Sequence, residues 1–193
     1  ILMTARHHLA TRYLRDAGAV SCAQLNHAGR FARTEAPLMP APMDATHLAF
    51  DMTSLKAFME SFPLEERFGL TWMVMRKAAS WQAGMSREQR QDVIRAFAQA
   101  AARAVAAGFD MVELHGATGY LLTQFLSAYT NRPAAGGSLP LAKRATLPLE
   151  VFRAVREAVP PDYPVGFRLL VREWTPDGVD LPEALDFAAL LEQ

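Results

Sequence analysis

Hydrophobic and polar positions along this chain repeat one order, in which a helical pattern is followed by a tight turn and a short apolar run. The spacing of the apolar residues predicts three helices, over 7–17, 86–107 and 148–159. An apolar stretch typical of a buried strand follows each helix, at 19–25, 109–115 and 164–170. This alternation favours βα units with parallel strands.

The helix over 86–107 has the clearest ends. Ser86 and Gln89 form a capping box at its start, and Gly108 closes it. The buried stripes expected for this helix and for 148–159 are Val93, Phe97, Ala101 and Ala104, and Leu149, Phe152, Val155 and Val159. Asp180 and Glu183 predict a capped further helix that still runs at the last residue.

The loops are long on one side of the predicted sheet only. Helix-to-strand turns are short, whereas the stretches after the first two strands run from 26 to 85 and from 116 to 147. A (β/α)8 TIM barrel has this asymmetry because its active site lies at the C-terminal ends of its strands. A doubly wound sheet is the alternative, but no glycine-rich phosphate loop follows any strand. A whole barrel needs about 250 residues, so this α/β chain is expected to form part of one, from unit two or three to unit five.

The composition is that of an ordinary soluble protein, with 51% hydrophobic residues and a formal net charge of zero. This balance favours no nucleic-acid partner, and no apolar run suits a membrane span, so a cytoplasmic location is expected. The single cysteine, Cys22, excludes an internal disulfide and is expected to be a buried, inert thiol. No metal is expected, because His7 and His8 are adjacent and lack the spacing of a zinc-binding helix.

Polar side chains stand where the predicted strands end. By strand alternation, Glu113, His115 and Arg168 face the barrel interior, while the large apolar residues between them face the outer helices. Gln24 ends the first strand, although the small residues of that strand leave its face open. An amide, an imidazole and a guanidinium would then converge at a barrel mouth, where function resides in this fold. The simpler alternatives are that His115 is a hydrogen-bonded core residue and that Arg168 neutralises Glu113.

The same residues carry a family resemblance. "QLNHAGR" (24–30) resembles the third-strand motif of the Old Yellow Enzyme family, also called the NADH:flavin oxidoreductases. "AAGFDMVELHGATGYLLTQFLS" (106–127) resembles the fourth-strand block of that family, and 130–169 follows with its Asn-Arg, Gly-Gly-Ser and downstream arginine elements in order. These proteins are FMN-containing (β/α)8 barrels. The resemblance implies an oxidoreductase that passes hydride from NADH or NADPH through FMN to an activated alkene, an enone or enoate, or a similar small-molecule acceptor.

The resemblance also implies a role for each residue. Gln24 would bind the pyrimidine edge of FMN through its amide, and Arg168 would lie near N1 and the C2 carbonyl, where its charge favours the reduced cofactor. His115 and Thr118 would hold the carbonyl oxygen of the substrate, and Tyr120 would supply a proton as general acid. His115 thus contributes to both the cofactor and the substrate site.

Two departures from the family pattern stand out. Thr118 occupies a place where the family usually has Asn or His, and a hydroxyl is a shorter donor. The loop after Asn131 lacks the usual acidic and aromatic stretch. The segment 31–85 is distinctive as well, since it holds seven of the nine methionines, and within it 63–82 resembles an amphipathic helix. We expect 31–85 to be a lid over the barrel mouth, within one FMN-binding domain over 1–193.

Two other functional hypotheses remain open on the residues alone. One is a flavin-free barrel lyase or isomerase that uses Glu113 and His115 as acid–base partners. The other is a truncated, non-catalytic remnant. For the FMN hypothesis, the isolated 193-residue chain is expected to be inactive, because the family's phosphate site comes from late strands. The resemblance also leaves open a homo-oligomer, and an additional FAD and 4Fe-4S cluster in the parent protein.

Overall fold

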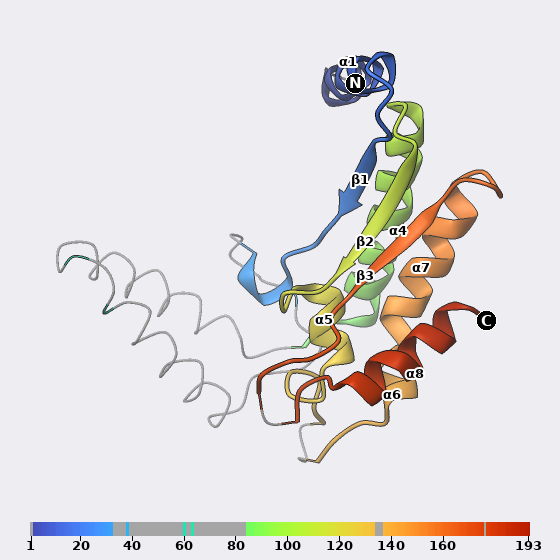
Figure 1. Cartoon of the computed structure of the whole chain (residues 1–193). Coiled ribbons are helices and arrows are strands. Elements are labelled where there is room, and N and C mark those ends of the chain that lie inside the picture. Colours follow the sequence, from blue (N-terminus) through green and yellow to red (C-terminus); the bar gives the residue numbers. More distant parts are fainter. Residues whose placement is uncertain are drawn as a thin grey trace.

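The computed structural model describes residues 2–32, 38, 60, 63, 84–133, 137–175 and 177–193. In these ranges the chain forms a three-stranded parallel sheet with helices on one of its faces (Figure 1). In chain order the elements are α1 (Leu2–Asp16), β1 (Cys22–Leu25), the 3-10 helix η1 (Gly29–Phe31), α4 (Arg87–Ala106), β2 (Met111–Gly116), α5 (Leu121–Leu126), α6 (Leu141–Arg144), α7 (Thr146–Ala158), β3 (Val165–Leu169) and α8 (Leu181–Leu191). The predicted alternation of helices and strands is confirmed.

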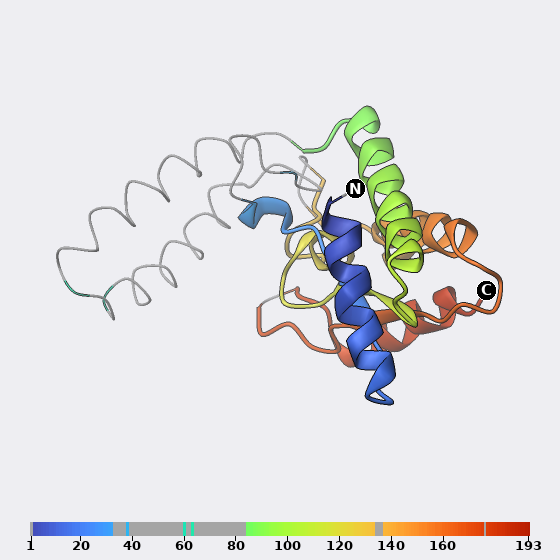
Figure 2. The same cartoon turned by 90° about the horizontal axis from the view of Figure 1, so that it is seen from above.

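The sheet has the order β1-β2-β3, so the central strand is β2. Its register places Gln24 beside Glu113, and His115 beside Arg168. Val112 and Leu114 are fully buried in the core that β2 shares with α4 and α7, as strand alternation predicts. Figure 1 shows these two helices beside the sheet. The polar residues of β2 therefore lie on the opposite face of the sheet, which no described helix covers (Figure 2).

The N-terminus of α4 confirms the predicted capping box. The Ser86 hydroxyl accepts a hydrogen bond from the Gln89 backbone N–H at 3.2 Å, and the Gln89 side chain accepts one from the Ser86 N–H at 2.8 Å. The predicted buried stripe of this helix is confirmed as well. This helix packs along α7, and together they form the layer that supports β1 and β2.

Helix α7 is rotated relative to the predicted stripe, and that prediction is wrong in part. Leu147, Pro148, Val151 and Val155 are buried, whereas Leu149 and Phe152 are half-buried. The helix begins two residues earlier than expected and presents a wide apolar surface, because one side meets α4 while Leu149 packs towards the smaller α8 core. The further helix also ends at Leu191 instead of running on to the last residue.

A buried arginine connects α8 to the rest of the fold through an ion pair. Arg144, at the end of α6, is 2% exposed and forms an ion pair with Glu183 in the first turn of α8. Its guanidinium also donates to the backbone oxygens of Leu126 and Leu139, the latter at 2.8 Å. The positive charge thus gains a carboxylate and two carbonyl acceptors, as a buried guanidinium requires. This contact fixes the chain that leads from α5 to α7.

The predicted lid over 31–85 lies almost entirely outside the described residues. Two of its described residues are packed against the fold, since Met85 is 6% exposed and Leu38 contacts the main core. In the loop after β2, Asn131 is buried and donates to the Phe125 carbonyl at 2.7 Å. Among the helices in the described ranges, none is long and apolar enough to cross a membrane.

Candidate active site

The uncovered face of the sheet carries the predicted polar residues. The Gln24 amide donates to the Glu113 carboxylate at 2.6 Å, which shows that both side chains share this face. The next position along β2 on the same face is His115, and its neighbour on β3 is Arg168. The structure therefore brings the amide, imidazole and guanidinium to one face, near the C-terminal ends of the strands.

A glycine on β3 lies beside these groups and places no side chain among them. Gly166 is the β3 neighbour of Glu113, and a Cβ added to it would meet nothing closer than 3.7 Å. Arg168 itself is exposed, and the described residues contain no ion pair between it and Glu113. The alternative in which Arg168 serves to neutralise Glu113 is thus not what the structure shows. The guanidinium remains available to an anionic or electron-rich ligand.

His115 is buried but not fully satisfied. It is 6% exposed, its Nε2 lies 2.9 Å from the Thr118 hydroxyl, and its buried Nδ1 has no hydrogen-bond partner in the described part of the chain. Burial, followed by the charge of Arg168, lowers the pKa of the imidazole, and Glu113 opposes them. A neutral imidazole can donate from one nitrogen and accept at the other.

A strained turn follows β2 and presents the remaining predicted residues. Thr118 has φ = 56°, which is unusual for a β-branched residue, and it is followed by Gly119 with φ = 73°. This turn directs Tyr120 back towards the strand, so that its ring centroid lies 5.3 Å from that of His115. Strain of this kind is concentrated at functional sites, where surrounding contacts hold it.

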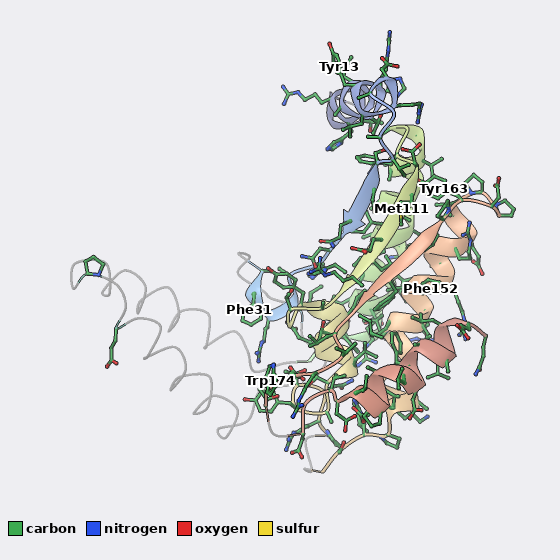
Figure 3. All side chains as sticks on the ribbon, in the orientation of Figure 1. Tyr13, Phe31, Met111, Phe152, Tyr163 and Trp174 are labelled. Carbon is green, nitrogen blue, oxygen red and sulfur yellow. The ribbon has the colours of Figure 1, made fainter. Side chains whose placement is uncertain are left out.

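Sequence reasoning missed one neighbour of Tyr120. Phe31, at the end of η1, packs edge-on against the Tyr120 ring with 6.4 Å between centroids. Figure 3 shows Phe31 at the end of the molecule where the strands finish. The available signal was an aromatic residue directly after "HAGR", which was assigned instead to the lid.

The predicted burial of Cys22 is wrong. The thiol is exposed, whereas a buried, inert cysteine was predicted. It lies two residues before Gln24 and so shares the uncovered face with it, because successive strand residues alternate between faces. Partial burial and the nearby Glu113 carboxylate raise the pKa of the thiol, which keeps it protonated.

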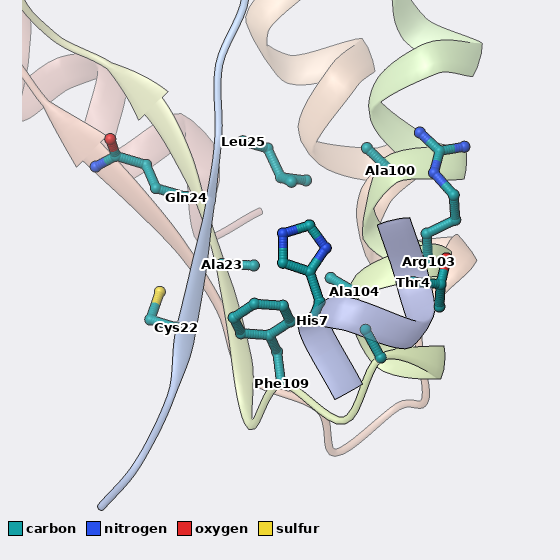
Figure 4. A pocket seen from close by; sticks show the side chains of 11 residues that line it. Thr4, His7, Cys22, Ala23, Gln24, Leu25, Ala100, Arg103, Ala104 and Phe109 are labelled. Carbon is teal, nitrogen blue, oxygen red and sulfur yellow. The ribbon is translucent and has the colours of Figure 1, made fainter. Parts of the chain in front are cut away.

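A cavity of about 410 Å³ lies elsewhere, between α1, β1 and α4. Figure 4 shows Ala23 and Leu25 pointing from β1 towards His7, while Cys22 and Gln24 point away from it. Cys22 and Gln24 are among the residues that line the cavity, but their side chains lie on the other side of β1 from His7. The described residues also contain no cluster of His, Cys, Asp or Glu side chains suited to a metal ion.

A parallel sheet with outer helices on one face and polar groups on the other, at the C-terminal ends of its strands, defines part of a (β/α)8 barrel with a candidate active site. A sequence model of the NADH:flavin oxidoreductase / NADH oxidase family matches residues 5–193, and the chain belongs to that family.

Several characterised proteins are similar to this chain. An NADH oxidase of Thermoanaerobacter brockii is 44% identical over 105 residues, which are 53% of this chain and 16% of that protein. The NADH-dependent flavin oxidoreductase nadA of Aspergillus parasiticus is 33% identical over 91% of this chain and 35% of its own length. The chain therefore spans only a sixth to a third of these relatives.

Solved structures agree with the fold. The Old Yellow Enzyme from Pichia sp. AKU4542 matches 97% of this chain with a TM-score of 0.70 and 27% identity, and 46% of that chain is covered. Morphinone reductase in complex with tetrahydroNAD matches 97% of this chain with a TM-score of 0.67 and 26% identity, over 49% of its own chain. In both matches, this chain corresponds to about half of a barrel protein.

Proposed function

We propose that the protein containing this chain is an FMN-dependent oxidoreductase that passes hydride from NADH or NADPH to an activated alkene. The observation that supports this most strongly is the convergence of Gln24, His115 and Arg168 on one uncovered face of the sheet. The nicotinamide reductant is supported by the relative named NADH oxidase and by an NADPH dehydrogenase of Bacillus cytotoxicus, which is 36% identical over 56% of this chain.

The residues on this face fit the pyrimidine edge of a flavin. The Gln24 amide donates to Glu113 and keeps its carbonyl oxygen for the N3–H group. Arg168 is a permanent cation without an ion-pair partner in the described ranges, and it suits the electron-rich N1 and C2 carbonyl. FMN, when bound, would supply the hydride chemistry that no side chain of this site provides.

The substrate side of the proposal rests on the turn after β2. The Nε2 of His115 and the Thr118 hydroxyl share a hydrogen bond of 2.9 Å, so the two groups lie side by side. A substrate carbonyl oxygen would replace that mutual bond and accept from both groups. Hydrogen bonds to that oxygen stabilise the negative charge that develops when the β-carbon accepts hydride. Tyr120 would then donate its phenolic proton to the α-carbon.

Thr118 bears on the substrate class. The Thr118 hydroxyl stands where the family usually has the longer hydrogen-bond donor of Asn or His. Loss of one well-placed donor typically costs about 10²-fold in rate. We therefore expect the preferred acceptor to be more strongly activated than a simple enone. We retain the cytoplasmic location and homo-oligomer as expectations.

The length of the relatives leaves room for further cofactors in the parent protein. The matched 105 residues are 16% of the Thermoanaerobacter brockii protein, whereas the matched 109 residues are 31% of the Bacillus cytotoxicus NADPH dehydrogenase. The first protein is therefore about twice as long as the second. An additional FAD and a 4Fe-4S cluster remain a prediction about the parent protein. Iron and flavin analysis of the parent protein distinguishes an enzyme with FMN alone from one that also contains FAD and a 4Fe-4S cluster.

Anaerobic spectroscopy of the full-length protein tests the proposal. We expect a yellow protein whose visible absorbance is bleached by NADH or NADPH and restored by an enone or enoate. The corresponding saturated ketone is the control and should leave the bleached protein unchanged. A colourless protein that does not take up added FMN would contradict the proposal.

A further inference from the structure

A buried amide joins the two loops that surround Tyr120. Gln124 lies in α5 and is 1% exposed. Its Oε1 accepts a hydrogen bond from the Arg30 backbone N–H at 3.2 Å, and its Nε2 donates to the Gly119 carbonyl at 2.7 Å. One side chain therefore bonds to the loop after β1 and to the loop after β2.

The loop after β1 is built to admit this amide. Gly29 has φ = 57°, and a Cβ added to it would lie 2.5 Å from the Gln124 Oε1. Glycine is thus required there both by its backbone conformation and by the close approach of the amide. A second bond, from the Leu121 N–H to the His27 carbonyl at 3.0 Å, joins the same loops.

The two residues that bond to the Gln124 amide are each adjacent in sequence to a residue of the Tyr120 site. Gly119 directly precedes Tyr120, and Arg30 directly precedes Phe31. Among the described residues, the rings of Phe31 and His115 pack against the phenol, at centroid distances of 6.4 and 5.3 Å. A shift of Gln124 would therefore move the backbone at Tyr120 and also the Phe31 ring that packs against the phenol.

We propose that Gln124 is a positioning residue that sets the place of the Tyr120 phenol for proton delivery, an inference that rests on the proposed function. The position needs a neutral group that accepts at one end and donates at the other, which an amide provides and a carboxylate or an apolar side chain does not. Misplacement of a reacting group by about 1 Å can cost about 10²-fold in rate.

The test uses the full-length flavoprotein and the variant Gln124→Met, which keeps the side-chain length but loses both hydrogen bonds. Thr123→Val is the matched control, because Thr123 is the preceding residue of α5, is 1% exposed, and its buried hydroxyl has no partner among the described residues. We measure the rate at which an alkene reoxidises the reduced flavin, with and without Tyr120→Phe in the same chain.

Gln124→Met should slow the alkene step by about tenfold or more when Tyr120 is present, within the loss expected for a misplaced reacting group. In the Tyr120→Phe background the same change should cost less than about twofold, because there is no phenol left to position. Hydrogen exchange at the Arg30 amide should accelerate, and Thr123→Val should behave like the parent. Equal losses in both backgrounds, or an equal loss in Thr123→Val, would overturn the inference.

Gln124→Glu provides a second test if the methionine variant does not fold. A neutral carboxylic acid can donate to the Gly119 carbonyl and a carboxylate cannot, so the alkene rate of this variant should recover as the pH falls. A pH profile identical to that of the wild type would count against the positioning role. Failure of the wild-type protein to reoxidise with any alkene would instead contradict the proposed function, so the two failures are distinguishable.

Discussion

His115 combines the chemistry of the site with its response to pH. The imidazole is buried, bonds to Thr118 through one nitrogen and leaves the other without a partner in the described chain. Burial and the charge of Arg168 lower its pKa, and Glu113 acts in the opposite direction. We expect a neutral imidazole at physiological pH, able to donate to a substrate oxygen without adding a charge to the flavin site.

Titration of histidine-labelled protein by NMR tests this account of His115. The pKa should lie below the ordinary histidine value of about 6.5. Arg168→Gln should raise it because a nearby positive charge is removed, and Glu113→Gln should lower it further. His27 is the internal control, since burial alone lowers its pKa, and it should not respond to Arg168→Gln. A His115 pKa that is insensitive to both substitutions would contradict the proposed convergence.

The direction of the shift also fixes its effect on stability. A histidine with a folded-state pKa below its unfolded value binds a proton less readily in the folded protein. Above the unfolded-state pKa, this difference does not change the free energy of unfolding. As the pH falls from about 6.5 towards the folded-state pKa, the free energy of unfolding decreases. The protein should become less stable over that range, in part through this residue.

At the scale of elements, the strands were the most predictable part of the fold. Period-two alternation assigned Val112 and Leu114 to the helix-covered face and Glu113 and His115 to the other, and the structure confirms both. Gln24 could not be assigned in this way because small residues, Ser21, Cys22 and Ala23, precede it in the predicted strand and show no clear alternation. Its face is set by the pairing register with Glu113, which is a tertiary property.

The helices show where local pattern is insufficient. Helix α7 contacts two different cores, so its apolar surface is too wide for one stripe to define its orientation. Helix α5 was not predicted, because it has only six residues and every one of them is buried, which removes the amphipathic signal. The missed helix carries Gln124, and a lone glutamine in an apolar run gives no indication of the two loops that it joins.

Two glycines on adjacent strands give a sharp test of the sheet. A Cβ on Gly116 would lie 2.1 Å from a Phe167 ring carbon, and that ring is held against Phe187 of α8. Gly116→Ala should therefore lower the free energy of unfolding by about 2–3 kcal/mol through overpacking. Gly166→Ala is the control, since its nearest neighbour would be 3.7 Å away, and it should change stability by less than about 0.5 kcal/mol. Equal denaturant midpoints for the two variants would show that this packing is misassigned.

At the scale of the whole molecule, the chain forms part of a barrel, and no helix of the described residues covers its interior face. The resemblance found from "QLNHAGR" and "ELHGATGY" is confirmed by the family match over residues 5–193 and by solved barrel structures. The motifs were informative because they lie at strand ends, where this fold places its ligands. The lid over 31–85 remains a prediction, since its sequence shows composition and helical spacing but not where the segment packs.

The dissociation constant of FMN, measured by flavin fluorescence on the full-length protein and its variants, tests the central claim most directly. Gln24→Leu and Arg168→Leu should each weaken FMN binding by about tenfold, the effect of losing one hydrogen bond to a polar or charged partner. Arg172→Leu is the matched control, because Arg172 is exposed and lies over the Trp174 ring, and it should stay within about twofold of the wild type. FMN binding that is unchanged in both Gln24→Leu and Arg168→Leu would contradict the account.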